Sequence, residues 1–189
     1  TVARFEERKG QDHTILALAA VRNTHPDVHL TLLGQGPYEN QLRALVKKHQ
    51  LEENVSFITQ ADNTEKYHQL QQADAFIMPT RLIPGKSVEG LGISYVEAML
   101  IGLPMIAGNI GGPCEIIHHG KTGYICDGAA ISSIHETMLK LINHPNDAFE
   151  YAKKAHSFAT TSLTLDCFHK KIHTLISNIR DRVKHPEKS

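Results

Sequence analysis

Residues 28–58, VHLTLLGQGPYENQLRALVKKHQLEENVSFI, contain a strand–helix–strand unit. Apolar side chains alternate along residues 28–34, which predicts a strand, and VSFI at 55–58 predicts another. Between them the turn 34–37 precedes a helical segment, and Pro37 suits the first turn of that helix. Strands joined by a helix through short connections lie parallel in one sheet, so this unit predicts an α/β fold.

The same order is repeated along the chain. Further strands are predicted at 1–4, 74–79, 103–108 and 123–127, and helices at 12–23, 64–73, 93–102, 130–143 and 146–158. We therefore expect a Rossmann-like parallel sheet of about six strands with helices on both faces.

The C-terminal part has a different pattern, which predicts one amphipathic helix over residues 163–183. Its apolar stripe consists of Phe168, Ile172, Leu175, Ile176, Ile179 and Val183. The stripe fits packing on this domain and packing on a partner domain equally well. The last residues, HPEKS at 185–189, are expected to fray.

The composition argues against several classes of protein. The 189 residues include 20 basic and 20 acidic side chains, so no overall charge attracts nucleic acid or an anionic membrane. No apolar run approaches the ~20 residues that span a bilayer. Three widely spaced cysteines favour a reducing compartment over a disulfide framework, and no histidine pair has the further ligands of a metal site. The strand-like start TVAR leads us to expect a piece of a longer protein.

Two phosphate-binding motifs are incomplete. Residues 85–87, GKS, end like a Walker A loop, but Thr80 stands where that loop needs its first glycine. Residues 34–36, GQG, begin like a dinucleotide fingerprint, but Glu39 stands where the third glycine belongs. Neither motif predicts a nucleotide site.

The segment EGLGISYVE carries two carboxylates, Glu89 in a glycine-containing loop and Glu97 inside a helix that begins near Ile93. Gly90 and Gly92 leave backbone N–H groups exposed at the start of that helix, where the helix dipole favours a phosphate. A carboxylate repels phosphate, so Glu89 is expected to contact sugar hydroxyls instead. Glu97 is placed to accept hydrogen bonds from a ribose.

Two basic residues, Arg4 and Lys9, follow the first predicted strand. The carboxyl ends of parallel strands share one edge of the sheet, where ligands bind, so both should approach the Glu89–Glu97 loop. A guanidinium fork and an ammonium group together suit a diphosphate. The glycine pair 111–112 supplies another tight connection at the same edge.

Seven blocks in unbroken order carry a resemblance to a known family. They are ARFEERKG (3–10), LLGQGP (32–37), ADAFIMPT (73–80), VEGLGISYVEA (88–98), GLPMIA (102–107), GGPCEII (111–117) and GKTGYI (120–125). Together they resemble the C-terminal half of GT-B glycosyltransferases, and more narrowly the retaining family-4 group with its E-x7-E motif. The resemblance covers residues 1 to about 160.

The resemblance implies a role for each part of the chain. Residues 1–160 would bind a nucleoside-diphosphate sugar, UDP- or GDP-hexose, and residues 161–189 would form a C-terminal helix and tail. The N-terminal acceptor domain would be absent, so the chain alone would fold but transfer no sugar. The whole enzyme would be a retaining hexosyltransferase of polysaccharide or glycolipid synthesis, cytoplasmic and at the inner face of the membrane through its missing half.

The resemblance also assigns site residues. The diphosphate ligands would be Arg4, Lys9 and the backbone of Gly90, Leu91, Gly92 and Ile93, with Glu89 as the catalytic group and Glu97 on the ribose. Ile58, Thr59 and Gln60 would border the base, although the family often has glycine at the place of Thr59. No metal is implied, because basic side chains neutralise the leaving diphosphate. A non-catalytic nucleotide-sugar-binding module and another GT-B enzyme, such as a phosphorylase or epimerase, remain alternatives.

Overall fold

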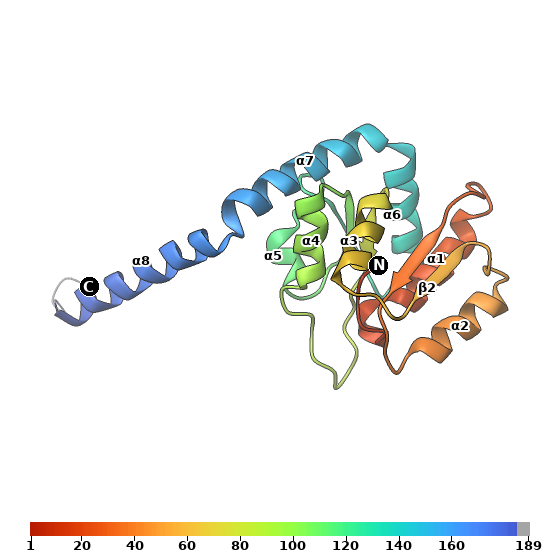
Figure 1. Ribbon diagram of the computed structural model, residues 1–189, viewed down its shortest axis with the longest axis horizontal. Coiled ribbons are helices and arrows are strands. Elements are labelled where there is room, and N and C mark those ends of the chain that lie inside the picture. Colours follow the sequence, from red (N-terminus) through yellow and green to blue (C-terminus); the bar gives the residue numbers. More distant parts are fainter. Residues whose placement is uncertain (185–189) are drawn as a thin grey trace.

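The computed structural model describes residues 1–184, and the surroundings of side chains as far as residue 177. Parallel strands alternate with helices, as expected (Figure 1). The strands are β1 (Leu30–Leu33), β2 (Val55–Ile58), β3 (Phe76–Met78), β4 (Met105–Gly108) and β5 (Tyr124–Cys126). The helices are η1 (Glu7–Lys9), α1 (Gln11–Val21), α2 (Glu39–Lys48), α3 (Asn63–Gln72), α4 (Ile93–Ile101), α5 (Pro113–Ile116), α6 (Ile131–Asn143), α7 (Pro145–Ser162) and α8 (Leu165–Lys184).

The described residues contain five strands, so the expected count of about six is wrong. The strands form two separate sheets, ordered β1-β2 and β3-β4-β5. The predicted strand at residues 1–4 lies beside β1 but makes a single bridge, from Val2 to Leu33. Leu33 N donates to the carbonyl of Thr1 and Ala3 N donates to the carbonyl of Leu33, but no second bridge extends this pairing into a ladder.

Two hydrophobic cores cover the two faces of the β3-β4-β5 sheet. Because successive side chains of a strand point to opposite faces, Ile77 belongs to one core and Phe76 and Met78 to the other. The first core is closed by α1, α2 and α6, and the second by α4, α5 and α7. Helices therefore cover both faces of this sheet, so a ligand site has to lie at the ends of the strands.

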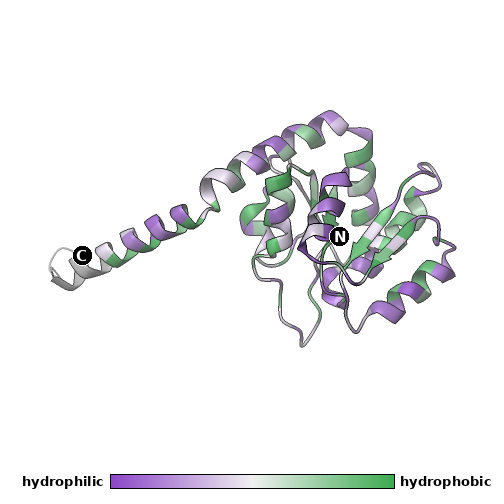
Figure 2. Ribbon diagram, viewed as in Figure 1, coloured by the Kyte–Doolittle hydropathy of each residue, from purple (hydrophilic) through white to green (hydrophobic). Residues whose placement is uncertain are grey.

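The last helix, α8, leaves the body of the domain (Figure 1). The apolar residues of its stripe alternate with polar ones along the helix (Figure 2), and Phe168, Ile172, Leu175 and Ile176 are between 39% and 58% exposed. Of the two interpretations of the stripe, the one in which these four residues pack on this domain is therefore wrong. The side chains of Ile179 and Val183, and the predicted frayed end 185–189, lie outside the described part. No helix within residues 1–184 is both long and apolar enough to cross a bilayer.

Candidate functional site

A cluster of charges lies where η1 meets the loop between β3 and α4. The Lys9 ammonium group and the Arg8 guanidinium group both bond the same carboxylate oxygen, Oε2 of Glu89, and the Arg8 Nη1 contact is 2.8 Å long. Lys9 and Glu89 side chains are each 10% exposed. The structure thus brings the predicted Lys9 and Glu89 together, with Arg8 as a further cation.

Arg4 does not contact the Glu89–Glu97 loop directly, although the prediction placed it beside that loop. Its side chain is 67% exposed and pairs with Glu6, whose other carboxylate oxygen bonds Arg8 at 2.9 Å. Arg4 therefore joins the cluster only through Glu6 and Arg8. The tight 3-10 turn of η1 aims Arg8 rather than Arg4 at Glu89, and nothing in the sequence except its place before Lys9 marked Arg8.

Gly10 fixes η1 against the end of β3. Its φ of +75° is left-handed, and a Cβ there would collide with the carbonyl oxygen of Pro79. The backbone N–H of Arg81 also donates to the carbonyl of Arg8 over 3.0 Å. The base of the loop that carries Glu89 is therefore tied directly to the turn that carries the two cations.

A buried ion pair strengthens the same junction. Arg81 grips the carboxylate of Asp12, in the first turn of α1, through two hydrogen bonds of 2.6 and 2.7 Å. The Tyr38 hydroxyl donates to the same carboxylate over 3.1 Å. Burial and the neighbouring Asp12 carboxylate raise the pKa of Tyr38 to about 12, so this hydroxyl keeps its proton at neutral pH. Sequence reasoning missed this pair, because its members are 69 residues apart.

The far side of the loop rests on the predicted glycine pair after β4. Gly111 has a φ of +83°, and the N–H of Gly112 donates to the carbonyl of Glu89 over 3.1 Å. A Cβ at Gly112 would collide with the carbonyl oxygen of Gly90. The two glycines let the turn before α5 approach the backbone at Glu89 closely, which places this turn at the same edge, as predicted.

The start of helix α4 is exposed to solvent and lies beside Glu89. Its N-cap is Gly92, with a left-handed φ of +71°, and Leu91 and Ile93 are 47% and 71% exposed. Tyr95 anchors the first turn, because its hydroxyl donates to the carbonyl of Met78 within the core and burial raises the pKa of its phenol. The first turn of α4 is therefore anchored in the core by Tyr95, while the side chains of Leu91 and Ile93 beside it face outward.

Glu97 lies one turn into α4 and is bound by α3. Its carboxylate accepts hydrogen bonds from Lys66 over 2.6 Å and from the Tyr67 hydroxyl over 3.4 Å. Tyr67 is 43% exposed, so its side chain is accessible at the site. Lys66 and Tyr67 are thus functional candidates that the sequence did not indicate.

The three residues expected to border a base lie just after β2. Ile58 and Gln60 line an open pocket of about 490 Å³, together with the first turn of α3, where Asp62 caps the helix through the N–H of Glu65. Thr59 does not line this pocket. Since α3 also carries Lys66 and Tyr67, this helix connects the pocket to Glu97.

These features lie at the carboxyl ends of parallel strands, the edge at which open α/β sheets hold phosphorylated ligands. Among the side chains described, those of residues 1–177, no three His, Cys, Asp or Glu are grouped so that they could hold a metal ion. The fold and the site define an α/β domain that presents basic side chains at the edge of the sheet where ligands bind.

Comparisons with known proteins narrow that class. Residues 1–158 match the family described as glycosyl transferases group 1, so the chain belongs to that family. It is 37% identical over 144 residues to a GDP-mannose-dependent alpha-(1-6)-phosphatidylinositol monomannoside mannosyltransferase of Mycobacterium tuberculosis, covering 75% of this chain. It is 30% identical over 160 residues to a glycogen synthase of the same organism, covering 85% of this chain.

The fold is likewise shared with a solved structure. Alr3699/HepE of Anabaena, crystallised with UDP and glucose, superposes with a TM-score of 0.80 over 94% of this chain at 22% identity. The domain therefore has the fold of one half of a GT-B glycosyltransferase. The chain spans 37% of the length of both M. tuberculosis relatives and 47% of the Anabaena chain.

Proposed function

We propose that this chain is the donor-binding half of a retaining family-4 glycosyltransferase. The whole enzyme would move a hexosyl unit from UDP- or GDP-hexose to a lipid or saccharide acceptor. The observation that carries the proposal is the convergence of Lys9 and Arg8 on Glu89, beside the open start of α4 and one turn before Glu97. A group 1 relative that uses GDP-mannose and a solved structure with UDP support a nucleoside-diphosphate donor.

Each side chain of the site would have a separate role in binding the donor. Lys9, with Arg8 and Arg4 behind it, would neutralise the diphosphate as it leaves, and the N–H groups of residues 90–93 would hold a phosphate oxygen. Glu89 would orient the sugar hydroxyls as the catalytic carboxylate. Glu97 would accept from the ribose, and Ile58–Gln60 would border the base.

The proposal also covers the setting of the reaction. The acceptor would bind to an N-terminal domain that faces this donor side, so residues 1–160 would not transfer sugar by themselves. Three free cysteines in the described part fit a reducing, cytoplasmic compartment. Any contact with the inner face of the membrane would be made through the acceptor half.

A ligand screen tests the proposal directly. Calorimetric titration with UDP, GDP, ADP and their hexose conjugates should identify one nucleotide that binds, and EDTA should leave its affinity unchanged because cationic side chains neutralise the phosphates. Loss of binding in EDTA would contradict metal-free neutralisation. If none of the nucleotides binds, at millimolar concentration and with or without Mg²⁺, the proposed function is wrong.

The two carboxylates should be separable by their ligands. Glu97→Gln should weaken the free nucleoside and the nucleoside diphosphate alike, by about 1.5–3 kcal/mol, because the ribose is common to both. Glu89→Gln should leave the nucleoside diphosphate bound and weaken the sugar conjugate relative to it. The measurement is a titration of each variant with all three ligands, and reversed patterns would show that the two roles are exchanged.

A further inference from the structure

Glu6 stands between Arg4 and Arg8 and contacts both of them. Its Oε1 lies 3.2 Å from Nε of Arg4, and its Oε2 accepts a hydrogen bond of 2.9 Å from Nε of Arg8. Each carboxylate oxygen therefore serves one guanidinium group. The proposed function uses the two arginines but gives no role to Glu6, although its side chain is only 24% exposed.

The backbone fixes the starting points of these side chains. Phe5 is fully buried in the core, and its N–H donates to the carbonyl of Gln35 over 3.0 Å. Glu6 is extended, with φ −137° and ψ 143°, so the side chains before and after Phe5 leave the chain on the side opposite to Phe5. The Gln11 amide, 1% exposed, donates to the carbonyl of Arg4 over 3.1 Å. The backbone is thus held in place, and the position of the cations depends on their contacts with Glu6.

Both arginines contact Glu6 through Nε, which leaves their terminal nitrogens for other acceptors. A guanidinium group carries its N–H donors in a planar fork, and a contact at Nε needs only one of them. Nη1 of Arg8 donates to a second acceptor, Oε2 of Glu89, over 2.8 Å. The Arg4 side chain is 67% exposed. Glu6 therefore holds one guanidinium group on each of its oxygens without using the ends that can bind a ligand.

The Glu6 carboxylate has two opposite effects on an anion that binds nearby. It keeps the two guanidinium groups close together, because without a carboxylate between them their like charges would repel. It also lowers the positive charge of the site and so weakens the attraction for every anion. A single phosphate group loses attraction and gains little from the fixed spacing. A diphosphate gains from the spacing, because each of its phosphate groups can bond one arginine.

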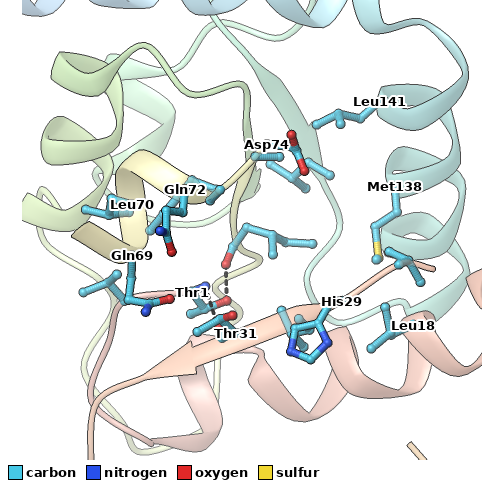
Figure 3. A pocket seen from close by; sticks show the side chains of 18 of the residues that line it. Thr1, Leu18, His29, Thr31, Gln69, Leu70, Gln72, Asp74, Met138 and Leu141 are labelled. Atoms are coloured by element: carbon cyan, nitrogen blue, oxygen red, sulfur yellow. Dashed lines mark hydrogen bonds between the residues drawn. The ribbon is translucent and has the colours of Figure 1, made fainter. Parts of the chain in front are cut away.

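The opposite edge of the sheet suits a phosphate poorly. A cavity of about 460 Å³ lies there, at the amino ends of β1 and β3, and its lining includes the apolar side chains of Leu18 and Met138 (Figure 3). Asp27 and Asp74, which also line it, are acidic and would repel a phosphate. The arginines on either side of Glu6 lie instead near the carboxyl ends of the strands, where open α/β sheets hold phosphorylated ligands.

We propose that Glu6 is a positioning residue that sets the preference of this site for a diphosphate over a monophosphate. It spaces Arg4 and Arg8 so that one phosphate group meets each guanidinium group. Glu6 itself contacts neither the phosphates nor the sugar and acts through the two arginines. This role rests on the proposed function, which assigns the diphosphate to this edge of the sheet.

Glu6→Gln separates the two effects, because glutamine keeps the size of the side chain and removes its charge. The variant and the native chain are titrated calorimetrically with uridine, UMP and UDP, and with guanosine, GMP and GDP. We expect the preference for the diphosphate over the monophosphate of the same base to fall roughly tenfold, the effect of one lost charge-assisted hydrogen bond. A parallel rise in affinity for both would show that Glu6 only weakens the attraction for anions, and this would overturn the proposal. An unchanged preference would overturn it as well.

Two further variants make the result specific. Arg4→Lys keeps the positive charge but has no guanidinium fork, so it should lower the same preference, and an unchanged preference would contradict the spacing role. Glu39→Gln is the matched control, because it breaks a comparable pair with Arg43, 2.8 Å long, on α2. It should change no affinity, and a fall in preference equal to that of Glu6→Gln would overturn the proposal.

The free nucleosides distinguish spacing from damage to the site. Their affinity should be the same for Glu6→Gln and the native chain, because they carry no phosphate. Equal losses for nucleoside, monophosphate and diphosphate would show general damage and would overturn the positioning role. If the native chain binds none of the nucleotides, the proposed function fails and the role of Glu6 fails with it. If the native chain binds a diphosphate and Glu6→Gln keeps the native preference, only the role of Glu6 fails.

Discussion

Replacing Arg81 with Met should lower the free energy of unfolding by about 3–5 kcal/mol, because the Asp12 carboxylate would stay buried without its cation. The Arg81 and Asp12 side chains are only 6% and 8% exposed. The Tyr38 hydroxyl would remain as a donor, but one neutral hydrogen bond does not replace a bidentate guanidinium. Urea unfolding followed by circular dichroism measures the loss.

An exposed ion pair on α7 provides the matched control. Lys153→Met removes the contact with Glu150, and both of these side chains are 56% exposed, so little change in stability is expected. A double variant, Asp12→Asn with Arg81→Met, should recover part of the loss because no unpaired charge is left. If Arg81→Met unfolds at the same urea concentration as Lys153→Met, the buried pair does not hold the loop base.

The same pair predicts how stability depends on pH. Burial acts to raise the pKa of Asp12, but the hydrogen bond and charge of Arg81 bring that pKa below its ordinary value. The unfolded chain therefore takes up a proton at a higher pH than the folded chain, and the pair's contribution, present above about pH 4, is lost as the pH falls further. The stability difference between the native chain and Arg81→Met should accordingly shrink in acid.

Lys9→Ala should weaken binding of the nucleoside diphosphate by about 1–3 kcal/mol, because it removes a charge-assisted hydrogen bond to the phosphates. Binding of the free nucleoside should hardly change, since it has no phosphate. Lys47→Ala on the exposed face of α2 is the matched control and should affect neither ligand. Calorimetry with both ligands on all three proteins makes the comparison.

Two results would contradict this assignment of Lys9. Equal losses for the nucleoside and the nucleoside diphosphate would move Lys9 away from the phosphates. An unchanged affinity for both would mean that Arg8 and the start of α4 suffice to hold the diphosphate. A melting curve for Lys9→Ala guards against misfolding, because the variant also leaves Glu89 with Arg8 as its cation.

The alternating elements could be predicted from sequence because their signals are local. Strand β2 begins and ends where the pattern put it, at 55–58, and α4 begins at Ile93 as its glycine-containing approach indicated. The approach of Lys9 to the Glu89–Glu97 loop could be predicted because parallel topology alone brings strand ends to one edge. These inferences need only the periodicity of apolar residues and the parallel order of the strands.

Orientation within short turns could not be predicted. The sequence does not encode η1 as a periodic pattern, so which of Arg4 and Arg8 meets Glu89 depends on a single tight turn. The contacts of Lys66 and Tyr67 with Glu97 join two different helices, and nothing in the sequence of α3 alone indicates them. The Asp12–Arg81 pair depends on contacts far apart in the chain, which local patterns do not contain.

The two ion pairs that Glu89 makes with Arg8 and Lys9 affect how a charged ligand would bind. The Arg8 and Lys9 cations already hold a counter-ion supplied by their own chain, so a diphosphate that binds as proposed would replace one anion by another. Affinity should then fall less steeply with salt than two unneutralised cations would imply. The exchange would also release the Glu89 carboxylate when the phosphates bind. Binding of the phosphates and movement of this carboxylate to the sugar would then be one coupled step.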